Sequence, residues 1–374
     1  MRVAVVTNVI PSYREDFYRR LFSHYGQDIQ VFCQDSIKGM NLECVHDNYP
    51  ENINIIRCTG LVRDVIAFQH VPVKRLYDEF DVIFFTGNPR VVSNVLWSSV
   101  LRLLGKRVVI WGQYHTANSG VLTKTIRLLW WKLFRNVFLY TDAEKEQYRQ
   151  TRSDGTVIVG MNNGLDQSDI VQARESFDQA DLAVWAESQQ LQDRKVILSC
   201  ARLDAKNRFE IMLEALPDIV RTHPEVLWCV IGGGVEEQRL RSMATELGVE
   251  GYVRWLGPIY GEQALAPWFL NAVCLIHPGA IGLSLLHAMG YGLPVVTHDN
   301  PLNQMPEFAA LTPDLNGVVY EEGDVASMCQ QVTRLIEDDE LAASLSEQAT
   351  RTVDEKYNTR AMSENFIDMV DAAR

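Results

Sequence analysis

Short apolar runs alternate with longer amphipathic segments along the whole chain. The runs, such as 2–7, 81–86 and 195–200, have the length of strands, and the segments between them show helical spacing of apolar residues. Alternation of this kind is typical of βα units on parallel sheets. We therefore predict an α/β fold with two doubly wound parallel sheets.

The predicted elements fall into two halves. In the first half we expect strands over 2–7, 29–33, 53–57, 81–86, 107–111, 137–140 and 157–160, and helices over 14–24, 70–78, 90–104 and 122–135. In the second half we expect strands over 195–200, 226–231, 252–256, 272–276, 293–296 and 317–320, and helices over 169–187, 207–221, 236–247, 262–269, 283–290 and from 324 to the end. This gives domains over 1–166 and 167–357, with a helix at about 358–374 expected to pack back on the first domain.

Length and composition indicate a globular protein of two domains. The chain has 374 residues, of which 47% are hydrophobic and 22% charged, and a single core stops growing at about 250–300 residues. Its longest apolar stretches are far shorter than the ~18 residues of a membrane span. The first ten residues lead into charged residues without a signal-peptide cleavage site. We therefore expect a cytoplasmic protein.

Cysteines and charge exclude further classes. The seven cysteines are scattered without a CxxC pair, which argues against a disulfide framework and a zinc site. Residues 1–168 hold 20 Lys and Arg against 16 Asp and Glu, a balance of +4, so the rest, with 15 against 32, carries −17. The basic residues form no dense patch with interleaved aromatics, so nucleic acid is not an expected partner. A membrane surface stays open as a partner of the first half.

Candidate chemistry lies at the predicted strand ends of the second half. Arg202 and Lys206 follow strand 195–200, where two cations suit a diphosphate; solvated surface cations are the alternative. Strand 226–231 runs into glycines at 232–234 and a helix, which favours close approach of an anion, although a plain turn explains it too. The third glycine of a GxGxxG fingerprint would fall at Glu237, which argues against a nicotinamide dehydrogenase.

A third strand end precedes helix 283–290. Free amides at 282–284, with the helix dipole behind them, would form a phosphate seat. On this helix Ser284, His287 and Tyr291 share one face, which we expect to meet a ligand or another domain. A buried, hydrogen-bonded histidine is the alternative for His287.

The segments 201–206, 232–234 and 282–289 form an ordered series with 255–258 and 292–296. The series resembles the retaining glycosyltransferases of family 4, which have the GT-B fold, and segments 163–166, 306–307 and 316–319 continue it. The resemblance spans about 163–320. It implies two Rossmann-like domains that face each other across a cleft, the first for the acceptor and the second for the nucleotide-sugar donor.

The resemblance also implies residue roles. Arg202 and Lys206 would hold the donor diphosphate and neutralise the leaving group, the amides of 281–284 would meet the same phosphates, and 258–259 would lie near the nucleobase. The family's paired glutamates fall on Gly279 and His287 here, so neither is present, although His287 can still bond a ribose hydroxyl. The predicted donor-binding residues are Arg202, Lys206, Gly233, Pro258, Ile259, Ile281, Gly282, Leu283, Ser284, His287 and Glu307.

The first half resembles the family less. The segment 10–14 replaces the glycine-rich loop that often follows the first strand, so Tyr13 and Arg14 become acceptor-side candidates, together with Gln113. His115, after strand 107–111, lies close to where the family keeps a histidine near the donor sugar. We predict that His115 contacts the reacting sugar, with a structural role as the alternative and Gln113 as its substitute if the loop is shifted.

Helix 122–135 combines apolar and basic residues. One predicted face carries Ile126, Leu129, Trp130, Leu133 and Phe134, and the other carries Lys124, Arg127, Lys132 and Arg135 with Leu128 and Trp131 among them. Exposed Trp and Leu among cations fit an anionic membrane surface. An ordinary core-packed helix with a solvated basic face is the alternative.

Together, the resemblance implies transfer of a sugar from a UDP- or GDP-sugar to a hydroxyl of a glycan or lipid-linked acceptor, with retention, in bacterial-type surface polysaccharide or lipopolysaccharide assembly. The predicted catalytic residues are His115, Arg202 and Lys206. No DxD motif stands out, so we expect no metal and no cofactor, and a place in the cytoplasm or on the inner face of the membrane. A non-hydrolysing nucleotide-sugar epimerase and a catalytically inactive nucleotide-sugar-binding scaffold stay open as alternatives.

Overall fold

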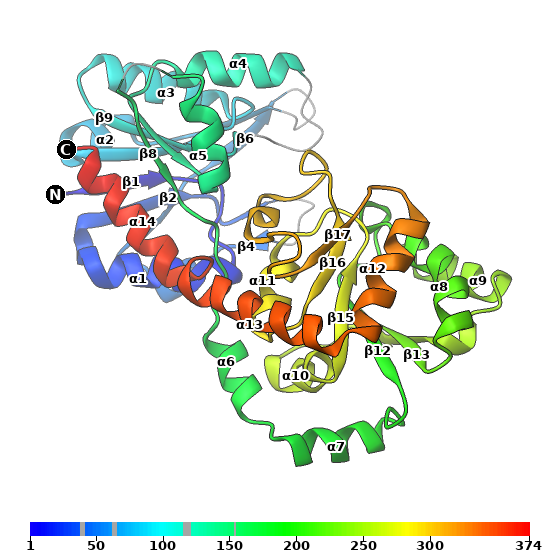
Figure 1. Cartoon of the computed structure of the whole chain (residues 1–374). Helices are drawn as coiled ribbons and strands as arrows, with labels where there is room; N and C mark the ends of the chain where they lie inside the picture. The colour runs from blue at the N-terminus through cyan, green and yellow to red at the C-terminus, as the bar shows by residue number, and fades with distance from the viewer. Residues whose placement is uncertain (38–41, 62–65, 115–120, 153–154) are drawn as a thin grey trace. The chain divides into compact units, whose positions relative to one another are not determined.

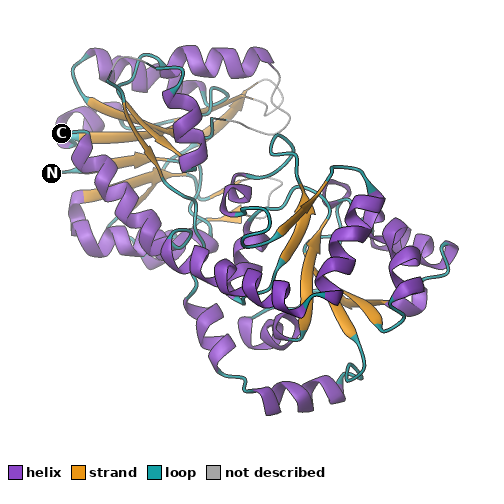
Figure 2. Ribbon diagram, viewed as in Figure 1, coloured by secondary structure: helices purple, strands orange, loops and turns teal. Residues whose placement is uncertain are grey.

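The computed structural model describes residues 1–37, 42–61, 66–114, 121–152 and 155–374. The chain divides into two compact units (Figure 1). Unit 1 comprises 1–166 together with 359–374, and unit 2 comprises 167–358. In each unit, helices cover both faces of a parallel sheet (Figure 2), so the predicted α/β class with two doubly wound sheets is confirmed.

The sheet of unit 1 is parallel throughout, with strand order β11-β10-β9-β8-β1-β2-β5. Its central strands are apolar and buried, as expected when both faces are covered. The bounds are β1 (Val3–Val6), β2 (Ile29–Cys33), β5 (Ile53–Ile55), β8 (Val82–Thr86), β9 (Arg107–Gly112), β10 (Asn136–Leu139) and β11 (Val157–Gly160). Two short antiparallel pairs accompany it: β3 (Ser36–Ile37) with β4 (Leu42–Glu43), and β6 (Cys58–Leu61) with β7 (Ile66–Gln69).

Two separate cores lie on the two faces of this sheet. In one, Phe366 of the C-terminal helix α14 stacks on Phe84 of β8 at a centroid distance of 4.4 Å, and Thr359 donates a hydrogen bond to the buried Asp16. These contacts tie the end of the chain into unit 1. The helices of the unit are α1 (Glu15–Tyr25), α2 (Val73–Glu79), α3 (Val92–Leu103), α4 (Val121–Trp131), α5 (Asp142–Arg149) and α14 (Thr359–Ala372).

Unit 2 has a six-stranded parallel sheet with strand order β14-β13-β12-β15-β16-β17. Its strands are β12 (Lys195–Cys200), β13 (Val226–Ile231), β14 (Val253–Gly257), β15 (Ala272–His277), β16 (Val295–His298) and β17 (Val318–Tyr320). Its helices are α6 (Ser168–Glu175), α7 (Gln179–Ser188), α8 (Glu210–Thr222), α9 (Glu237–Glu246), α10 (Glu262–Leu270), α11 (Leu283–Gly290), α12 (Val325–Glu337) and α13 (Asp339–Glu355). The centre of the strand order, β12 beside β15, is where the chain reverses direction across the sheet, the usual place for a ligand.

The single helix expected over 169–187 is two helices. Asp178 starts the second one with a capping box, in which its carboxylate accepts the N–H of Asp181 and the Asp181 carboxylate accepts the N–H of Asp178. Such a box satisfies backbone donors at a new helix start. The charge-rich pattern of this segment hid the break.

The predicted faces of helix 122–135 are wrong in part. Trp131, expected among the exposed basic residues, is fully buried and donates from Nε1 to the carbonyl of Gly87, while Arg127 is buried and donates to the carbonyl of Tyr114. Ile126, Leu129 and Leu133 are instead exposed by 51%, 59% and 58%. The cause is the space beside Gly87, where an added Cβ would lie 2.5 Å from the Trp131 ring. Because residue 87 is a glycine, the indole of Trp131 fits beside it, and the helix is oriented with Trp131 toward the core.

Candidate functional site

Two exposed cations follow strand β12. Arg202 and Lys206 lie in the loop that leads to α8, and within the described part of the chain no carboxylate forms an ion pair with either of them. Arg208, two residues further on, pairs with Glu322 at 3.6 Å. The loop is fixed from inside, because buried Asn207 donates from Nδ2 to the carbonyl of Arg202 at 2.7 Å. The loop thus holds two positive charges at the carboxyl end of β12, where both are available to bind an anion.

The glycines at 232–234 bring the end of β13 against this loop. Gly232 has φ +135°, and a Cβ there would lie 2.0 Å from the carbonyl oxygen of Ala201, so only glycine fits. The N–H of Leu203 donates to the carbonyl of Gly233 at 3.1 Å. A Cβ on Gly233 would lie 3.8 Å from Pro258. The structure therefore places two predicted donor-binding residues, Gly233 and Pro258, next to each other. They lie beside the loop that carries Arg202 and Lys206, which we call the cation loop. Ile259, the next residue, is half-buried.

The start of α11 provides the predicted phosphate seat only in part. The N–H of Ile281 already donates to Oε1 of Gln304 at 2.7 Å, and Ile281 is buried. This contact contradicts the expected use of the Ile281 amide for a phosphate. The N–H of Leu285 bonds within the turn to the carbonyl of Gly282 at 3.0 Å. The amides left at the positive end of the helix dipole are those of Gly282, Leu283 and Ser284.

Gly279 joins this seat to the cation loop. A Cβ at position 279 would lie 2.2 Å from the carbonyl oxygen of Lys206 and 2.7 Å from Cα of Asn207. Glycine at this position, where the resemblance implies a glutamate, therefore lets two backbone segments touch. Glu307, another predicted donor residue, is buried and lies beside the seat, with Oε2 3.7 Å from the position of a Cβ on Gly282.

His287 and Tyr291 converge on Glu262, the first residue of α10. The Nε2 of His287 lies 2.9 Å from Oε2 of Glu262, and the hydroxyl of Tyr291 donates to the same oxygen at 2.6 Å. The ring of Phe269 packs against both, at centroid distances of 4.6 and 4.9 Å. The polar face of α11 thus meets α10 of its own unit, and the Nε2 of His287 is engaged with a carboxylate.

The hydrogen bonds decide the charge of Glu262. Burial works to raise the pKa of Glu262, but the bonds from His287 and Tyr291 outweigh burial and hold that pKa below its usual value. Burial, followed by the charge of Glu262, raises the pKa of the Cys200 thiol to about 12. Glu262 is therefore an ionised carboxylate near the end of β12. The prediction missed it because its partners lie 25 and 29 residues away in the sequence.

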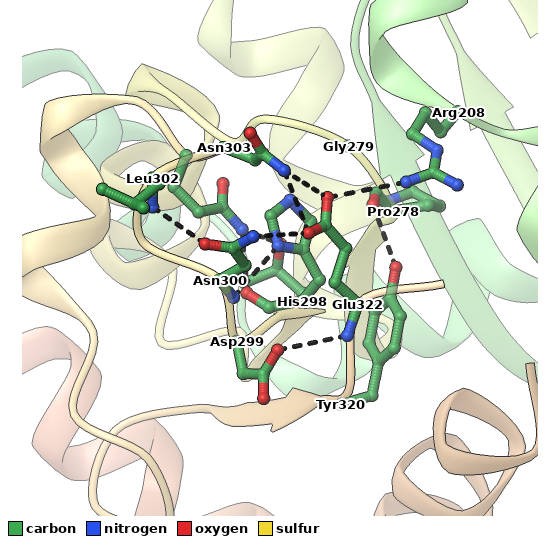
Figure 3. Close-up of polar contacts among 12 residues, drawn as sticks. Arg208, Pro278, Gly279, His298, Asp299, Asn300, Leu302, Asn303, Tyr320 and Glu322 are labelled. Carbon is green, nitrogen blue, oxygen red and sulfur yellow. Dashed lines mark hydrogen bonds and ion pairs between the residues drawn. The ribbon is translucent and has the colours of Figure 1, made fainter. Parts of the chain in front are cut away.

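A polar network closes the other side of the sheet edge, at the ends of β16 and β17 (Figure 3). The carboxylate of Glu322 accepts from Asn300 at 2.6 Å and from Asn303 at 2.8 Å, besides its pair with Arg208. Tyr320 donates to the carbonyl of Pro278 at 2.9 Å. These bonds satisfy one another, so we assign the network to holding the loops after β12 and β15 in place.

In unit 1, Tyr13 and Arg14 line a pocket of about 220 Å³ at the carboxyl ends of β1, β8 and β9. The guanidinium of Arg14 lies 5.9 Å from the Tyr13 ring and 5.8 Å from the Tyr140 ring. Two buried polar atoms of the lining, Nε1 of Trp111 and Oδ1 of Asn8, have no hydrogen-bond partner within the described residues. Gln113 is half-buried just after β9, and His115 lies outside the described residues. The wall of the pocket therefore contains one buried donor and one buried acceptor without a partner among the described residues.

Residues 184–352 match the family model described as glycosyl transferases group 1. This segment holds β12 to β17 and every loop of the cation and amide site. Unit 2 is similar to glycosyltransferase group 1 domains over most of its length. The match confirms the resemblance at this level.

Curated relatives match over about two fifths of the chain. A GDP-mannose-dependent alpha-(1-6)-phosphatidylinositol monomannoside mannosyltransferase of Mycolicibacterium smegmatis is 27% identical over 161 residues, 41% of each chain. The lipopolysaccharide core biosynthesis glycosyltransferase LpsE of Rhizobium meliloti is 27% identical over 153 residues, 40% of this chain and 42% of that protein. The matches therefore span about two fifths of the length of these relatives.

Solved structures match over the whole length. Anabaena Alr3699/HepE in complex with UDP superposes with a TM-score of 0.73 at 14% identity, covering 100% of both chains. The lipopolysaccharide outer core galactosyltransferase WaaB, in its apo form, superposes with a TM-score of 0.68 at 16% identity, again over 100% of both chains. At this identity the likeness shows the fold alone, and that fold is GT-B, as predicted.

Proposed function

We propose that the protein is a retaining glycosyltransferase that moves a sugar from a UDP- or GDP-sugar to a hydroxyl of a glycan or lipid-linked acceptor. The observation that carries the proposal is the pairing of two cations, Arg202 and Lys206, with the amides at the start of α11, in a unit similar to glycosyltransferase group 1 domains. Among the described residues neither cation has a carboxylate partner. A diphosphate is a ligand that can bind the cations and the helix amides at the same time. The names of LpsE and WaaB support surface polysaccharide or lipopolysaccharide assembly as the setting.

In the proposed reaction the bond between the anomeric carbon and the diphosphate oxygen breaks, and the acceptor oxygen forms the new bond to that carbon. The acceptor proton passes to the departing phosphate, and the nucleoside diphosphate leaves. Arg202 and Lys206 stabilise the negative charge that grows on the diphosphate, which is usually the largest contribution in such transfers. Because these cations supply positive charge, we propose that no metal is required. Attack on the face from which the diphosphate departs retains the configuration and needs no carboxylate nucleophile.

We assign the donor ribose to Glu262. The position that carries a glutamate in the family is His287 here, and its Nε2 holds the carboxylate of Glu262 from α10. The Glu262 side chain is 24% exposed, so it is partly open to solvent. It follows the turn 258–261, which the resemblance assigns to the nucleobase. An ionised carboxylate at that point is a strong acceptor for a ribose hydroxyl.

We assign the acceptor to the pocket of unit 1. Tyr13, Tyr140 and Trp111 present aromatic surface, which suits the apolar face of a sugar ring, and Nε1 of Trp111 and Oδ1 of Asn8 offer hydrogen bonds to its hydroxyls. Gln113 and His115 remain proposed contacts to the acceptor and the reacting sugar.

Turnover tests the proposal against its alternatives. Purified protein is incubated with UDP- and GDP-sugars, with and without a panel of glycan and lipid-linked acceptors, and release of the nucleoside diphosphate is measured together with the anomeric configuration of the product. Acceptor-dependent release with retained configuration is the expected result. Conversion of the donor without acceptor would indicate an epimerase or a hydrolase. Nucleotide binding without any turnover would indicate the scaffold, to which the missing glutamates at Gly279 and His287 point.

A further inference from the structure

Six large aliphatic side chains are exposed on two neighbouring helices of unit 1. Single exposed leucines are common, but a contiguous group on a soluble surface marks an interaction site. The most exposed of them, Leu103, shows 87% of its surface to solvent. The group consists of Leu96, Leu103 and Leu104 on and after α3, and Ile126, Leu129 and Leu133 on and after α4. We call this group and the cations around it the α3–α4 face.

The topology of the sheet places α3 beside α4. Helix α3 connects β8 to β9, helix α4 connects β9 to β10, and the three strands are consecutive neighbours in the sheet (Figure 1). Successive right-handed crossovers in one direction lie on the same face of a sheet. Leu101 of α3 and Trp131 of α4 accordingly belong to the same core cluster. Ile126, Leu129 and Leu133 are three and four positions apart, and Leu96 and Leu103 are seven apart, so each helix presents an apolar stripe outward.

Charge shows which partner this face suits. The sequence from 82 to 141 contains eight Lys and Arg and no Asp or Glu, in a chain with a net charge of −13. The exposed Arg107, Lys132 and Arg135 lie within a few residues of Leu103, Leu104 and Leu133. Cations at helix ends also complement the helix dipole, but this accounts for none of the exposed leucines. Exposed apolar side chains in a segment whose only charged residues are cations match the acyl boundary and phosphates of an anionic lipid surface.

We propose that the α3–α4 face docks unit 1 on an anionic lipid bilayer. The aliphatic side chains enter the boundary between headgroups and acyl chains, and the cations bind lipid phosphates. Within the described residues no helix has the length and hydropathy to cross a bilayer, so the proposed binding is peripheral. This inference rests on unit 1 alone and does not depend on the donor chemistry proposed for unit 2.

Co-sedimentation with vesicles tests it. The full chain is mixed with vesicles of phosphatidylcholine alone, or of phosphatidylcholine with phosphatidylglycerol, at low and high salt. We expect binding to the anionic vesicles only, weakened by salt. The charge variant Lys132→Glu/Arg135→Glu and the apolar variant Leu129→Ser/Leu133→Ser should each weaken binding by about tenfold or more. The matched controls Arg221→Glu and Val184→Ser change an exposed cation and an exposed valine of unit 2 and should bind like the wild type.

Thermal melting shows that each variant is folded, as expected for exposed positions. Failure of the wild type to bind anionic vesicles, or equal binding by the wild type and both variants, would overturn the proposal. A dimer that the leucine variant disperses, without vesicle binding, would reassign the face to contact with a second copy of the chain. Nucleotide binding is measured without vesicles, so a failure here is distinguishable from a failure of the proposed function.

Discussion

The Nε2 atom of His287 and the Oε2 atom of Glu262 lie 2.9 Å apart and join α11 to α10. The pair includes His287, the position at which the family resemblance implies a glutamate. A carboxylate is thus present at this place, but it comes from a neighbouring helix and is held by a histidine and a tyrosine. In the proposed function, this carboxylate takes the place of the missing glutamate as the acceptor for a ribose hydroxyl.

Glu262→Gln should weaken binding of the nucleoside diphosphate by about tenfold to a hundredfold, because a hydrogen bond to a charged group contributes about 1.5–3 kcal/mol. The amide keeps the shape and loses the charge. Calorimetry on the wild type and the variant measures the effect, with the exposed Glu250→Gln as control. Unchanged affinity in Glu262→Gln would limit Glu262 to joining the two helices.

The same carboxylate makes stability depend on pH. Because the pKa of Glu262 in the folded protein lies below the value of 4.5 for a free glutamate, its contribution is complete above about pH 4.5 and is lost as the pH falls through the lowered pKa. The difference in Tm between wild type and Glu262→Gln should therefore be constant near neutral pH and shrink in acid. A difference that persists unchanged in acid would contradict this ionisation.

Restoring the missing glutamate should damage the protein. In Gly279→Glu, and already in Gly279→Ala, the new Cβ would lie 2.2 Å from the carbonyl oxygen of Lys206. We expect a loss of about 1–3 kcal/mol of stability or more, together with weaker nucleotide binding, because the cation loop must shift. Gly251→Ala is the control, since a Cβ there meets no atom within 4 Å. Wild-type stability and affinity in Gly279→Ala would show that the loops separate freely.

The acceptor pocket is tested by Trp111→Phe, which keeps most of the ring and removes the N–H. We expect the KM for the acceptor to rise by about two- to tenfold, the effect of one hydrogen bond, with nucleotide affinity unchanged. Trp130→Phe is a matched control, because Trp130 is equally buried in unit 1 and also has no partner for Nε1 within the described residues. An equal rise in both variants, or none in Trp111→Phe, would remove Trp111 from the acceptor site.

The sequence predicted elements where a local pattern determines them. The apolar run 195–200 coincides with β12, and the helix expected over 283–290 coincides with α11. Helix α5, with charged residues at most of its eight positions, shows too little apolar periodicity and was missed. The break before α7 depends on one hydrogen-bonded cap at Asp178, which periodicity does not reveal.

The sequence predicted only those residues of the site that directly follow a strand of the parallel sheet. Arg202, Lys206 and the amides at the start of α11 follow from the rule that ligands lie at the carboxyl edge of a parallel sheet. The role of Glu262 depends on side chains that meet across two helices. The orientation of α4 depends on the space that Gly87 leaves for Trp131, a tertiary contact 44 residues apart in sequence. Neither can be obtained from spacing along the chain.

Calorimetric titration of UDP and GDP into the wild type and into Arg202→Ala/Lys206→Ala tests the central claim most directly. The control variant Arg334→Ala/Arg351→Ala removes two exposed cations of unit 2 that are paired with Asp314 and Glu355. We predict that the wild type and the control bind one of the two nucleotides. The double variant should lose about a hundredfold in affinity or more, because it lacks two charged partners of the diphosphate. Equal binding by all three proteins, or no binding of either nucleotide by the wild type, would contradict the donor site described here.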